Sequence, residues 1–559
     1  MRLFYAFVVT LCVLSSCFST LSFSQARRAD FLAARAKWVH ENIAVAALKL
    51  DAAIIPTFQN PKAQELYVNG TTIPYVTFDV GPSWAGLLPI SNSTNETRQL
   101  FFWYFPSQSV DGTNDLVIWM NGGPGCSSLE GLLQENGPFL WQWGTAQPMP
   151  NPYAWNTLAN VLWVEQPVGT GFSQGKPSIH DENELAQQFY GFLIQFFNVF
   201  TEIKNNSIYL TGESYAGFYI PYIANYIYEL SVEQTTMLNL NLQGILLFDP
   251  SISNDLLQVQ IPSVSFVHMH QNIFNFNASF LSYLDAQSVK CGYANYSNLY
   301  GSYPPAGPFP TLFTDLNNIP YECDLWSAIF NAALIINPAF NIYRITDTPP
   351  ILWDVLGFPG SFPNQQSPIY FNRSEVQTVI HAPNIVWTEC STSNVFVNGI
   401  DQSPAPALSV LPNVIEKSHR TIIVNGQHDF RIIAEGTSLT IQNMTWHGMQ
   451  GFQTKPFFRF VVPGQGDLGF IHTERGLTYA EIVLSGHMVP QFQPRAALQI
   501  LQLLLGRIVL ENETSTLSTS PDSTTFHAQS NLAFAVMHSS ACYCFYLLFQ
   551  MYHFLRIIR

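Results

Sequence analysis

Short apolar runs that end in polar or glycine-rich turns recur along the middle of the chain. They are DLVIWMN (115–121), NVLWVEQP (160–167), SIYLTGE (207–213), GILLFDP (244–250) and TIIVNGQHD (421–429). Helix-like stretches such as FYIPYIANYIYEL (218–230) alternate with them. This alternation predicts an α/β fold with a mostly parallel central sheet flanked by helices. Ligands in such sheets bind at the carboxyl ends of the strands, so the polar residues after these runs are candidate site residues.

One predicted strand leads directly into a candidate nucleophile. In LTGESYAGFY (210–219), Ser214 stands between Glu213 and Tyr215, at the point where a strand passes into a helix. Such a turn can push a serine hydroxyl out of the sheet, but a serine at a helix start can also be a simple cap. The stretch departs from the pattern Gly-x-Ser-x-Gly, because Ala216 occupies the fifth position. Taken alone, it leaves both interpretations open.

An acid and a base follow in the order Ser, Asp, His, which is typical of hydrolases built on α/β sheets. Asp429 lies in NGQHDF just past a strand, and His487 follows another apolar strand in EIVLSGHMVPQFQP. Asp249 in LLFDPS also ends a strand and is a rival acid, and Asp467 is a weaker rival. The first strand leads into NGGPGCSSLEGLLQENGP (121–138), whose glycines favour an irregular loop with backbone amides free to face a ligand.

Composition narrows the possible partners. The chain has 559 residues, of which 47% are hydrophobic and 11% charged, and its formal net charge is −15. This balance permits a large core and argues against nucleic acid or an anionic membrane surface as a partner.

The N-terminus predicts entry into the secretory pathway. Residues 1–24 combine Arg2, an apolar centre and small residues, as a signal peptide does, and 25–64 form a possible propeptide or N-terminal extension. In a secreted protein, Asn-x-Ser/Thr triplets are predicted sites of N-glycosylation. These sites are Asn69, Asn92, Asn95, Asn205, Asn277, Asn295, Asn372, Asn443 and Asn512.

The C-terminus predicts attachment to the cell surface. Residues 509–531 form a Ser/Thr-rich stalk, and 532–559 form a hydrophobic anchor signal. A polar spacer before an apolar end resembles a GPI-attachment signal, whereas the final RIIR favours a membrane span, with GPI slightly preferred. Between the two ends lie four cysteines, which suggest two disulfides with three possible pairings. They are Cys126, Cys291, Cys323 and Cys390.

Five long motifs in order resemble the serine carboxypeptidase family, especially its secreted and cell-surface fungal members. They are WMNGGPGCSSLEGLLQENGPF, NPYAWNTLANVLWVEQPVGTGFS, TGESYAGFYIP, IQNMTWHGMQGFQ and SGHMVPQFQP. The resemblance covers residues 65–508 and implies the α/β-hydrolase fold, with an insertion at about 251–375 that covers the active site. The chain departs from the family where it has GQHDF at the acid and LLFDPS after the strand that follows the nucleophile.

The resemblance also assigns roles to individual residues. It implies that Ser214 is the nucleophile, His487 the general base and Asp429 the acid that orients it. The implied oxyanion donors are the backbone N–H groups of Gly123 and Tyr215. The residues implied to bind the substrate's terminal carboxylate are Asn121, Gly122, Glu135 and Glu213. The implied disulfides are Cys126–Cys390 and Cys291–Cys323.

Two glutamates at a carboxylate-binding site need a physical explanation. If one of the pair is protonated, it can donate a hydrogen bond to the substrate carboxylate, and burial raises carboxyl pKa values enough to allow this in acid. The sequence therefore predicts a serine-type carboxypeptidase that acts on peptide and protein C-termini through an acyl-enzyme at acidic pH, with no metal or other cofactor. An esterase or acyltransferase with the same triad is the alternative, and a non-catalytic binding protein on the same scaffold is a third class.

Overall fold

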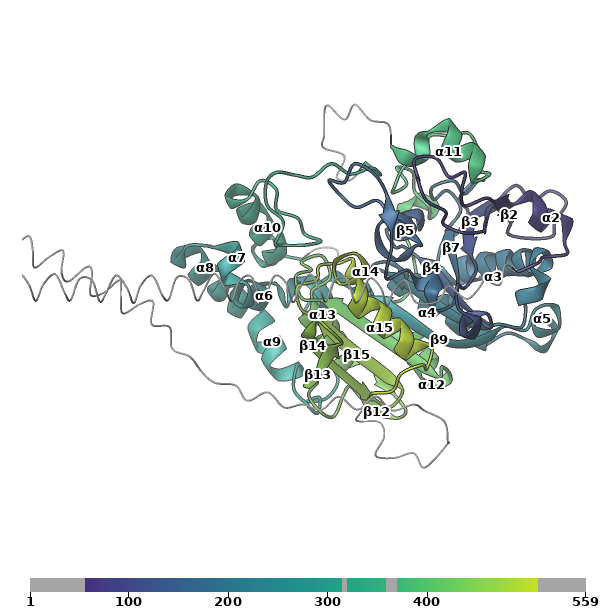
Figure 1. The fold of residues 1–559 in the computed structure, drawn as a ribbon. Coiled ribbons are helices and arrows are strands. Elements are labelled where there is room, and N and C mark those ends of the chain that lie inside the picture. Colours follow the sequence, from purple (N-terminus) through teal and green to yellow (C-terminus); the bar gives the residue numbers. More distant parts are fainter. Residues whose placement is uncertain (1–55, 314–318, 358–368, 511–559) are drawn as a thin grey trace, which may run out of the picture. The chain divides into compact units, whose positions relative to one another are not determined.

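The computed structural model describes residues 56–313, 319–357 and 369–510 (Figure 1). The predicted signal peptide (1–24) and anchor signal (532–559) lie outside the described residues, as do most of the predicted extension and stalk. Within the described residues, no helix has the length and apolar character needed to cross a membrane.

A large sheet forms the centre of the fold. Its strand order is β1-β2-β3-β7-β4-β8-β9-β10-β15-β14-β13. The strands from β7 to β15 in this order are parallel, and the strands at both edges pair antiparallel. Their bounds are β1 Tyr67–Val68, β2 Ser83–Pro89, β3 Gln99–Phe105, β4 Asp115–Met120, β7 Asn160–Glu165, β8 Ser207–Glu213, β9 Asn241–Phe248, β10 Arg420–Gly426, β13 Phe458–Val462, β14 Gly466–Glu474 and β15 Leu477–Ile482.

The five apolar runs of the sequence are β4, β7, β8, β9 and β10, so the predicted α/β class is confirmed. Every residue of β7 is buried, and β4 is buried from Leu116 onward. Central strands of a parallel sheet are covered on both faces, and they therefore read as continuous apolar runs. The antiparallel edges, in contrast, were not part of the prediction.

Helices pack on the sheet and place the segments that follow its strands. α3 packs on α4, α4 packs on β8 and β9, and α15 packs on β9 and β10. α3 begins at Asp181, whose side chain accepts a hydrogen bond from the Glu184 N–H, as an N-cap does. The bounds are α2 Pro61–Glu65, α3 Glu182–Val199, α4 Ala216–Tyr228, α5 Val232–Met237, α11 Ser374–Val379, α12 Leu411–Lys417, α13 Ala434–Asn443, α14 Val489–Phe492 and α15 Pro494–Leu504. Two small hairpins pair β5 (Phe139–Leu140) with β6 (Met149–Pro150) and β11 (Thr445–Trp446) with β12 (Met449–Gln450).

The described residues of the predicted insertion at 251–375 include several helices. Its helices are α6 Ser263–Met269, α7 Gln271–Phe274, α8 Ala278–Lys290, α9 Tyr293–Tyr300 and α10 Leu325–Ile336. The Pro- and aromatic-rich part around YPPAGPFP (303–310) lacks helices, and so do residues 337–357. α10 is apolar on nearly all sides, which hides the helical period in its sequence. Cys291 is joined to Cys323 within this insertion, the pairing that the resemblance implies.

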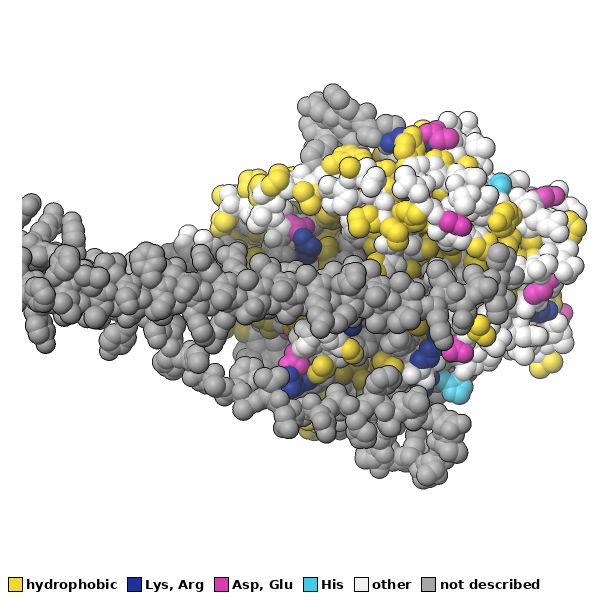
Figure 2. Space-filling model, in the orientation of Figure 1, with side chains coloured by type: hydrophobic (Ala, Val, Ile, Leu, Met, Phe, Trp, Pro, Cys, Tyr) yellow, Lys and Arg dark blue, Asp and Glu magenta, His cyan; other side chains and the backbone are white. Residues whose placement is uncertain are grey.

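The surface carries few charges. Figure 2 shows scattered Lys, Arg, Asp and Glu side chains among larger white and yellow areas of the described residues. The sequons Asn69, Asn92, Asn95, Asn205, Asn277 and Asn295 are exposed. Asn372 is half-buried and its amide donates to the Trp387 carbonyl at 2.9 Å. Asn443 is half-buried, and Asn512 lies outside the described residues.

Candidate active site

Ser214 lies on a strained turn between β8 and α4. Its φ is +60°, a left-handed conformation that is unfavourable for any residue except glycine. Its N–H donates to the Phe248 carbonyl at 3.0 Å, and its own carbonyl accepts from the Ser251 N–H at 2.9 Å. The N-cap position of α4 is Tyr215, and no side chain caps the helix. Ser214 is therefore not the helix cap that the sequence left open, and the last residue of β9 together with the turn after β9 holds its backbone.

Asp429 and His487 come together from the loops after β10 and β15. His487 Nδ1 lies 2.7 Å from Asp429 Oδ2, and the two residues are 3% and 0% exposed. Asp429 also accepts from the N–H groups of Arg431 at 2.7 Å and Ile432 at 3.2 Å, which fix the carboxylate. Asp467, the weaker rival, instead accepts from Arg459 Nε at 2.8 Å on the exposed part of β14.

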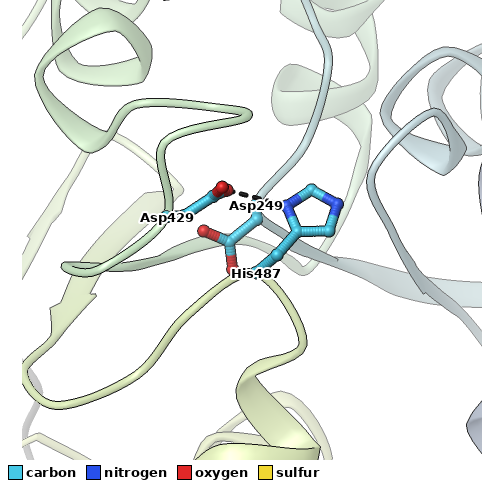
Figure 3. A group of neighbouring side chains, drawn as sticks. All are labelled: Asp249, Asp429 and His487. Carbon is cyan, nitrogen blue, oxygen red and sulfur yellow. Dashed lines mark hydrogen bonds and ion pairs between the residues drawn. The ribbon is translucent and has the colours of Figure 1, made fainter. Parts of the chain in front are cut away.

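Asp249, the stronger rival, lies against Asp429 and not in its place. Figure 3 shows the side chains of Asp249, Asp429 and His487 grouped together. One carboxylate oxygen of each aspartate and one ring nitrogen of the histidine lie within 4.8 Å of one another. Asp249 Oδ1 accepts from the Gly426 N–H at 2.7 Å and from Asn425 Nδ2 at 3.3 Å. Burial, followed by the charge of Asp429, raises the pKa of Asp249 well above the ordinary value. The raised pKa favours the protonated form of Asp249, which can donate a hydrogen bond to the adjacent Asp429 carboxylate.

The glycine-rich loop after β4 reaches the nucleophile. A Cβ on Gly122 would lie 2.3 Å from the Tyr215 nitrogen, so only glycine permits this approach. Gly123 has a φ of +113°, which glycine also tolerates. The disulfide Cys126–Cys390, the pairing that the resemblance implies, joins this loop to a segment 264 residues later in the chain. The loop thus brings the backbone of Gly122 and Gly123 beside that of Tyr215.

A buried group of acids adjoins Ser214. Asn121 Nδ2 donates to Glu213 Oε1 at 2.9 Å and lies 3.5 Å from Glu135 Oε1, while Trp119 Nε1 fixes the Asn121 oxygen at 2.7 Å. Burial raises the pKa of Glu135 to about 8 and that of Glu213 well above its ordinary value. Like charges this close cannot both ionise cheaply, so the pair holds a proton between them in acid.

A cavity of about 270 Å³ unites these parts. Its lining includes Ser214 and His487 together with Asn121, Gly122, Gly123, Glu213 and Tyr215. Glu135 and Asp429 stand behind these residues and contact the cavity through Asn121 and His487. A nucleophile with a candidate base, a glycine-rich loop and a protonated carboxyl group therefore face one space.

Comparison with known proteins identifies the family. The model of the serine carboxypeptidase family matches residues 78–507 of the chain. The chain belongs to the serine carboxypeptidase family. A probable serine carboxypeptidase of Arthroderma benhamiae is 47% identical over 472 residues, which cover 80% of this chain and 88% of the relative. Serine-type carboxypeptidase F of Aspergillus niger is 43% identical over 491 residues, covering 81% and 91%.

A solved structure agrees in fold with this serine carboxypeptidase. The prohormone-processing carboxypeptidase Kex1(delta)p of Saccharomyces cerevisiae superposes with a TM-score of 0.62 at 23% identity, covering 81% of this chain and 97% of that one. The fold is that of the α/β-hydrolases, as the strand order and the flanking helices indicate.

The sequence did not identify every residue that lines the cavity of this serine carboxypeptidase. Glu130, Tyr343 and Glu389 also line the cavity. Glu130 lies within the glycine-rich loop motif, and Glu389 directly precedes Cys390. Their positions beside residues already assigned to the site could have indicated that they line it. Tyr343 had no such signal. It belongs to the insertion, and its carbonyl accepts the His487 N–H at 2.7 Å.

Proposed function

We propose that this serine carboxypeptidase releases C-terminal residues from peptides with Ser214 as nucleophile, and that it works best in mildly acidic solution. His487 takes the Ser214 proton as the hydroxyl attacks the last peptide carbonyl. Asp429 keeps Nδ1–H of His487 directed away from Ser214 and stabilises the imidazolium. The N–H groups of Gly123 and Tyr215 receive the oxyanion, at about 2.7–4 kcal/mol for each donor.

The same groups complete the cycle. His487 returns the proton to the leaving amine, and the C-terminal amino acid departs while the rest of the peptide remains as an ester of Ser214. A water molecule then attacks this ester with His487 as base, which frees the acid product and restores the serine. Each turnover consumes one water molecule and leaves the protein unchanged.

One observation carries the end-specificity: the buried pair Glu135 and Glu213 beside the nucleophile, held by Asn121. A protonated carboxyl group donates a hydrogen bond to a free substrate carboxylate, whereas an internal amide would leave it unmatched at about 1–3 kcal/mol. An esterase or an acyltransferase has no need for this pair. Retention of Ser214, Asp429 and His487 also disfavours a purely binding role.

The test compares a free-acid peptide with its C-terminal amide across pH. Because burial raises the pKa of Glu135 to about 8 and that of Glu213 well above its ordinary value, the pair is protonated in mildly acidic solution and loses protons as the pH rises past about 8. We expect KM for the free-acid peptide to rise in that window before kcat falls, and KM for the amide to stay level. Glu213→Gln keeps a donor at every pH and should flatten the rise.

Glu481→Gln is the matched control, since Glu481 is another buried carboxyl with a raised pKa and does not line the cavity. It should leave the KM profile of the wild-type protein in place. Equal profiles for the acid and the amide would show that the pair does not bind the carboxylate, and would favour the general esterase.

We further propose that the chain follows the secretory pathway and is held at the cell surface. Support comes from the signal-like residues 1–24, the sequons and the apolar residues 532–559. Phosphatidylinositol phospholipase C should release the protein from cells if the tail is a GPI signal. Retention after treatment, with the terminal RIIR still detected by mass spectrometry, would favour a membrane span.

A further inference from the structure

Two carboxyl groups lie side by side outside the lining of the catalytic cavity. Glu182, the first residue of α3, is 0% exposed, and Asp401 lies on the segment that precedes α12. The Glu182 N–H donates to Ser403 Oγ at 2.7 Å, and the Ser403 hydroxyl donates to Asp401 Oδ1 at 2.6 Å. The reaction described above uses neither acid, so the burial of Glu182 beside Asp401 needs another explanation.

Hydrogen bonds divide the charge between the two acids. Asp401 accepts from three donors: the Tyr215 hydroxyl on Oδ2 at 2.8 Å, and the Ser403 N–H and hydroxyl on Oδ1 at 2.9 and 2.6 Å. No donor group of the described residues bonds to the carboxyl oxygens of Glu182. Donors stabilise a charged carboxylate, whereas a buried carboxyl group without donors is costly to ionise. Asp401 is therefore the charged member, and Glu182 is the protonated member that can donate to it.

The surroundings of Glu182 favour its protonated form. Burial, followed by the charge of Asp401 and a hydrogen bond with its side chain, raises the pKa of Glu182 well above the ordinary value, and the charge of Asp181 adds to this. The other titratable groups that face the pair are the hydroxyls of Tyr215, Tyr219 and Tyr222. Since none of these groups is a cation, nothing among them offsets a second negative charge beside Asp401.

Two of these tyrosines connect the pair to the groups proposed to receive the oxyanion. Tyr215 supplies one donor with its backbone N–H, and its hydroxyl donates to the pair at 2.8 Å. The Tyr219 hydroxyl, one helical turn later, accepts the Gly125 N–H at 3.1 Å, two residues beyond the other proposed donor, Gly123. Burial, followed by the charge of Glu182, raises the pKa of Tyr219, so this acid lies near its hydroxyl. The pair is therefore next to the supports of both donors.

We propose that Glu182 and Asp401 form a carboxyl pair that positions the oxyanion site, because it fixes Tyr215 through the hydroxyl and holds the glycine-rich loop through Tyr219. This inference rests on the proposed function. The two acids do not line the cavity, so both are positioning residues. A donor N–H is effective only when it lies about 2.7–3.1 Å from the place where the oxyanion forms. Displacement of Tyr215 or the loop should therefore weaken binding of the transition state more than binding of the substrate.

The experiment uses the full-length protein and two peptide inhibitors that differ only in their C-terminal group, an aldehyde and the corresponding alcohol. The Ser214 oxygen adds to the aldehyde carbon, and the hydroxyl proton passes through His487 to the former carbonyl oxygen, which occupies the place of the oxyanion. The alcohol binds without forming this bond. The inhibition constants of both ligands are measured together with kcat and KM for one peptide substrate.

Glu182→Ala should weaken binding of the aldehyde by about 10- to 100-fold and lower kcat by a similar factor, which is less than the loss of an entire oxyanion donor. Binding of the alcohol and KM should change little. Tyr215→Phe removes a hydrogen bond to the pair without changing either acid and should have a similar effect. Glu182→Gln keeps a donor to Asp401 and should restore most of the aldehyde affinity. Tyr215→Phe should add little to Glu182→Ala, since both break one connection.

Tyr222→Phe is the matched control. The Tyr222 hydroxyl donates to the Pro404 carbonyl at 2.7 Å, so this variant loses a bond from α4 to the segment that contains Asp401 and should keep the aldehyde affinity of the wild-type protein. The comparison of Tyr215→Phe with Tyr222→Phe decides where Glu182→Ala does not fold. Variants that weaken aldehyde and alcohol equally, or neither, overturn the proposal. Equal binding of aldehyde and alcohol by the wild-type protein would instead refute the proposed nucleophile and oxyanion site themselves.

Discussion

Asp249 is the immediate neighbour of Asp429, the acid of the proposed triad. Its side chain is buried beside Asp429, and its backbone has a φ of +40°, a left-handed conformation. The Gly426 N–H and the Asn425 amide bind one of its oxygens, which leaves the other to face Asp429. Because burial and Asp429 raise its pKa, Asp249 can donate a hydrogen bond to the Asp429 carboxylate.

The two aspartates should therefore respond differently to amide substitution. Asp429→Asn should lower kcat by about 10⁴-fold, since the histidine loses the partner that fixes its tautomer. Asp249→Asn should keep most of kcat, because an amide also donates a hydrogen bond. Loss of the Asp249 proton at high pH places two negative charges together, so Asp249→Asn should also extend activity to more alkaline solution. The measurement is kcat against pH for both purified variants.

Unfolding temperatures close to that of the wild-type protein serve as the control for folding. If Asp249→Asn were inactive while Asp429→Asn remained active, the roles of the two acids would have to be exchanged.

Residue identities in the site could be predicted only where a motif spans them. The pairing of Asp429 with His487 follows from their order along the chain and their place after strands. The proximity of Asp249 does not, because it depends on β9 and β10 being parallel neighbours, with Phe248 opposite Val424. Glu130 and Glu389 were missed for a similar reason: the cavity they share is formed by segments about 260 residues apart.

Among the elements, the glycine-rich loop after β4 is the one that a disulfide joins to a distant segment of the chain. Cys126–Cys390 joins it to the segment that contains Glu389, and the Ser391 N–H donates to the Gly125 carbonyl at 2.8 Å. The second disulfide, Cys291–Cys323, lies within the insertion and does not line the catalytic cavity. The two bridges thus offer a matched pair for experiment.

Removing each bridge should affect stability and activity differently. Cys126→Ala/Cys390→Ala should lower the free energy of unfolding by about 5 kcal/mol in the chain-entropy model, and Cys291→Ala/Cys323→Ala by about 4 kcal/mol. Only the first should strongly lower kcat of the protein that remains folded, because it frees the loop that holds Gly123. Denaturant unfolding and active-site titration give the two quantities. Equal losses of kcat in both variants would contradict the assigned role of the loop.

The elements themselves were predictable to the extent that burial leaves a pattern. Central strands such as β4 and β8 are continuous apolar runs, and their bounds match the prediction within a few residues. The edge strand β13 alternates buried with more exposed residues, and most residues of β14 are half-buried or exposed, so neither strand is a continuous apolar run. The helices of the insertion were hidden by proline, aromatic residues and an apolar α10.

The whole molecule buries many carboxyl groups with raised pKa values. Burial raises the pKa of Glu165 and Glu435 to about 7, and of Glu135 and Glu481 to about 8, from an ordinary value of 4.5. In this range the folded protein binds more protons than the unfolded chain. Its free energy of unfolding must then fall as the pH rises.

We therefore expect these groups to make the unfolding temperature fall as the pH rises from about 4.5 toward about 8. Scanning fluorimetry at constant ionic strength measures this. Glu481→Gln removes one of the contributing groups and should make the fall shallower. An unfolding temperature that rises through this window would refute the sign of the effect.

The segment 342–345 of the insertion carries a consequence for protein engineering. Its backbone accepts from the Phe430 N–H at 2.8 Å and the His487 N–H at 2.7 Å, and the Ile345 N–H donates to the His428 carbonyl at 3.1 Å. A Cβ on Gly486 would lie 2.2 Å from the Tyr343 backbone oxygen. The segment that contains Gly486 can therefore pack this closely against segment 342–345 only with a glycine at position 486. A chimera that takes its insertion from a relative would therefore replace the backbone hydrogen bonds that hold the segments of the proposed base, His487, and the proposed acid, Asp429. Grafts intended to alter substrate choice have to preserve these four residues as part of the recipient.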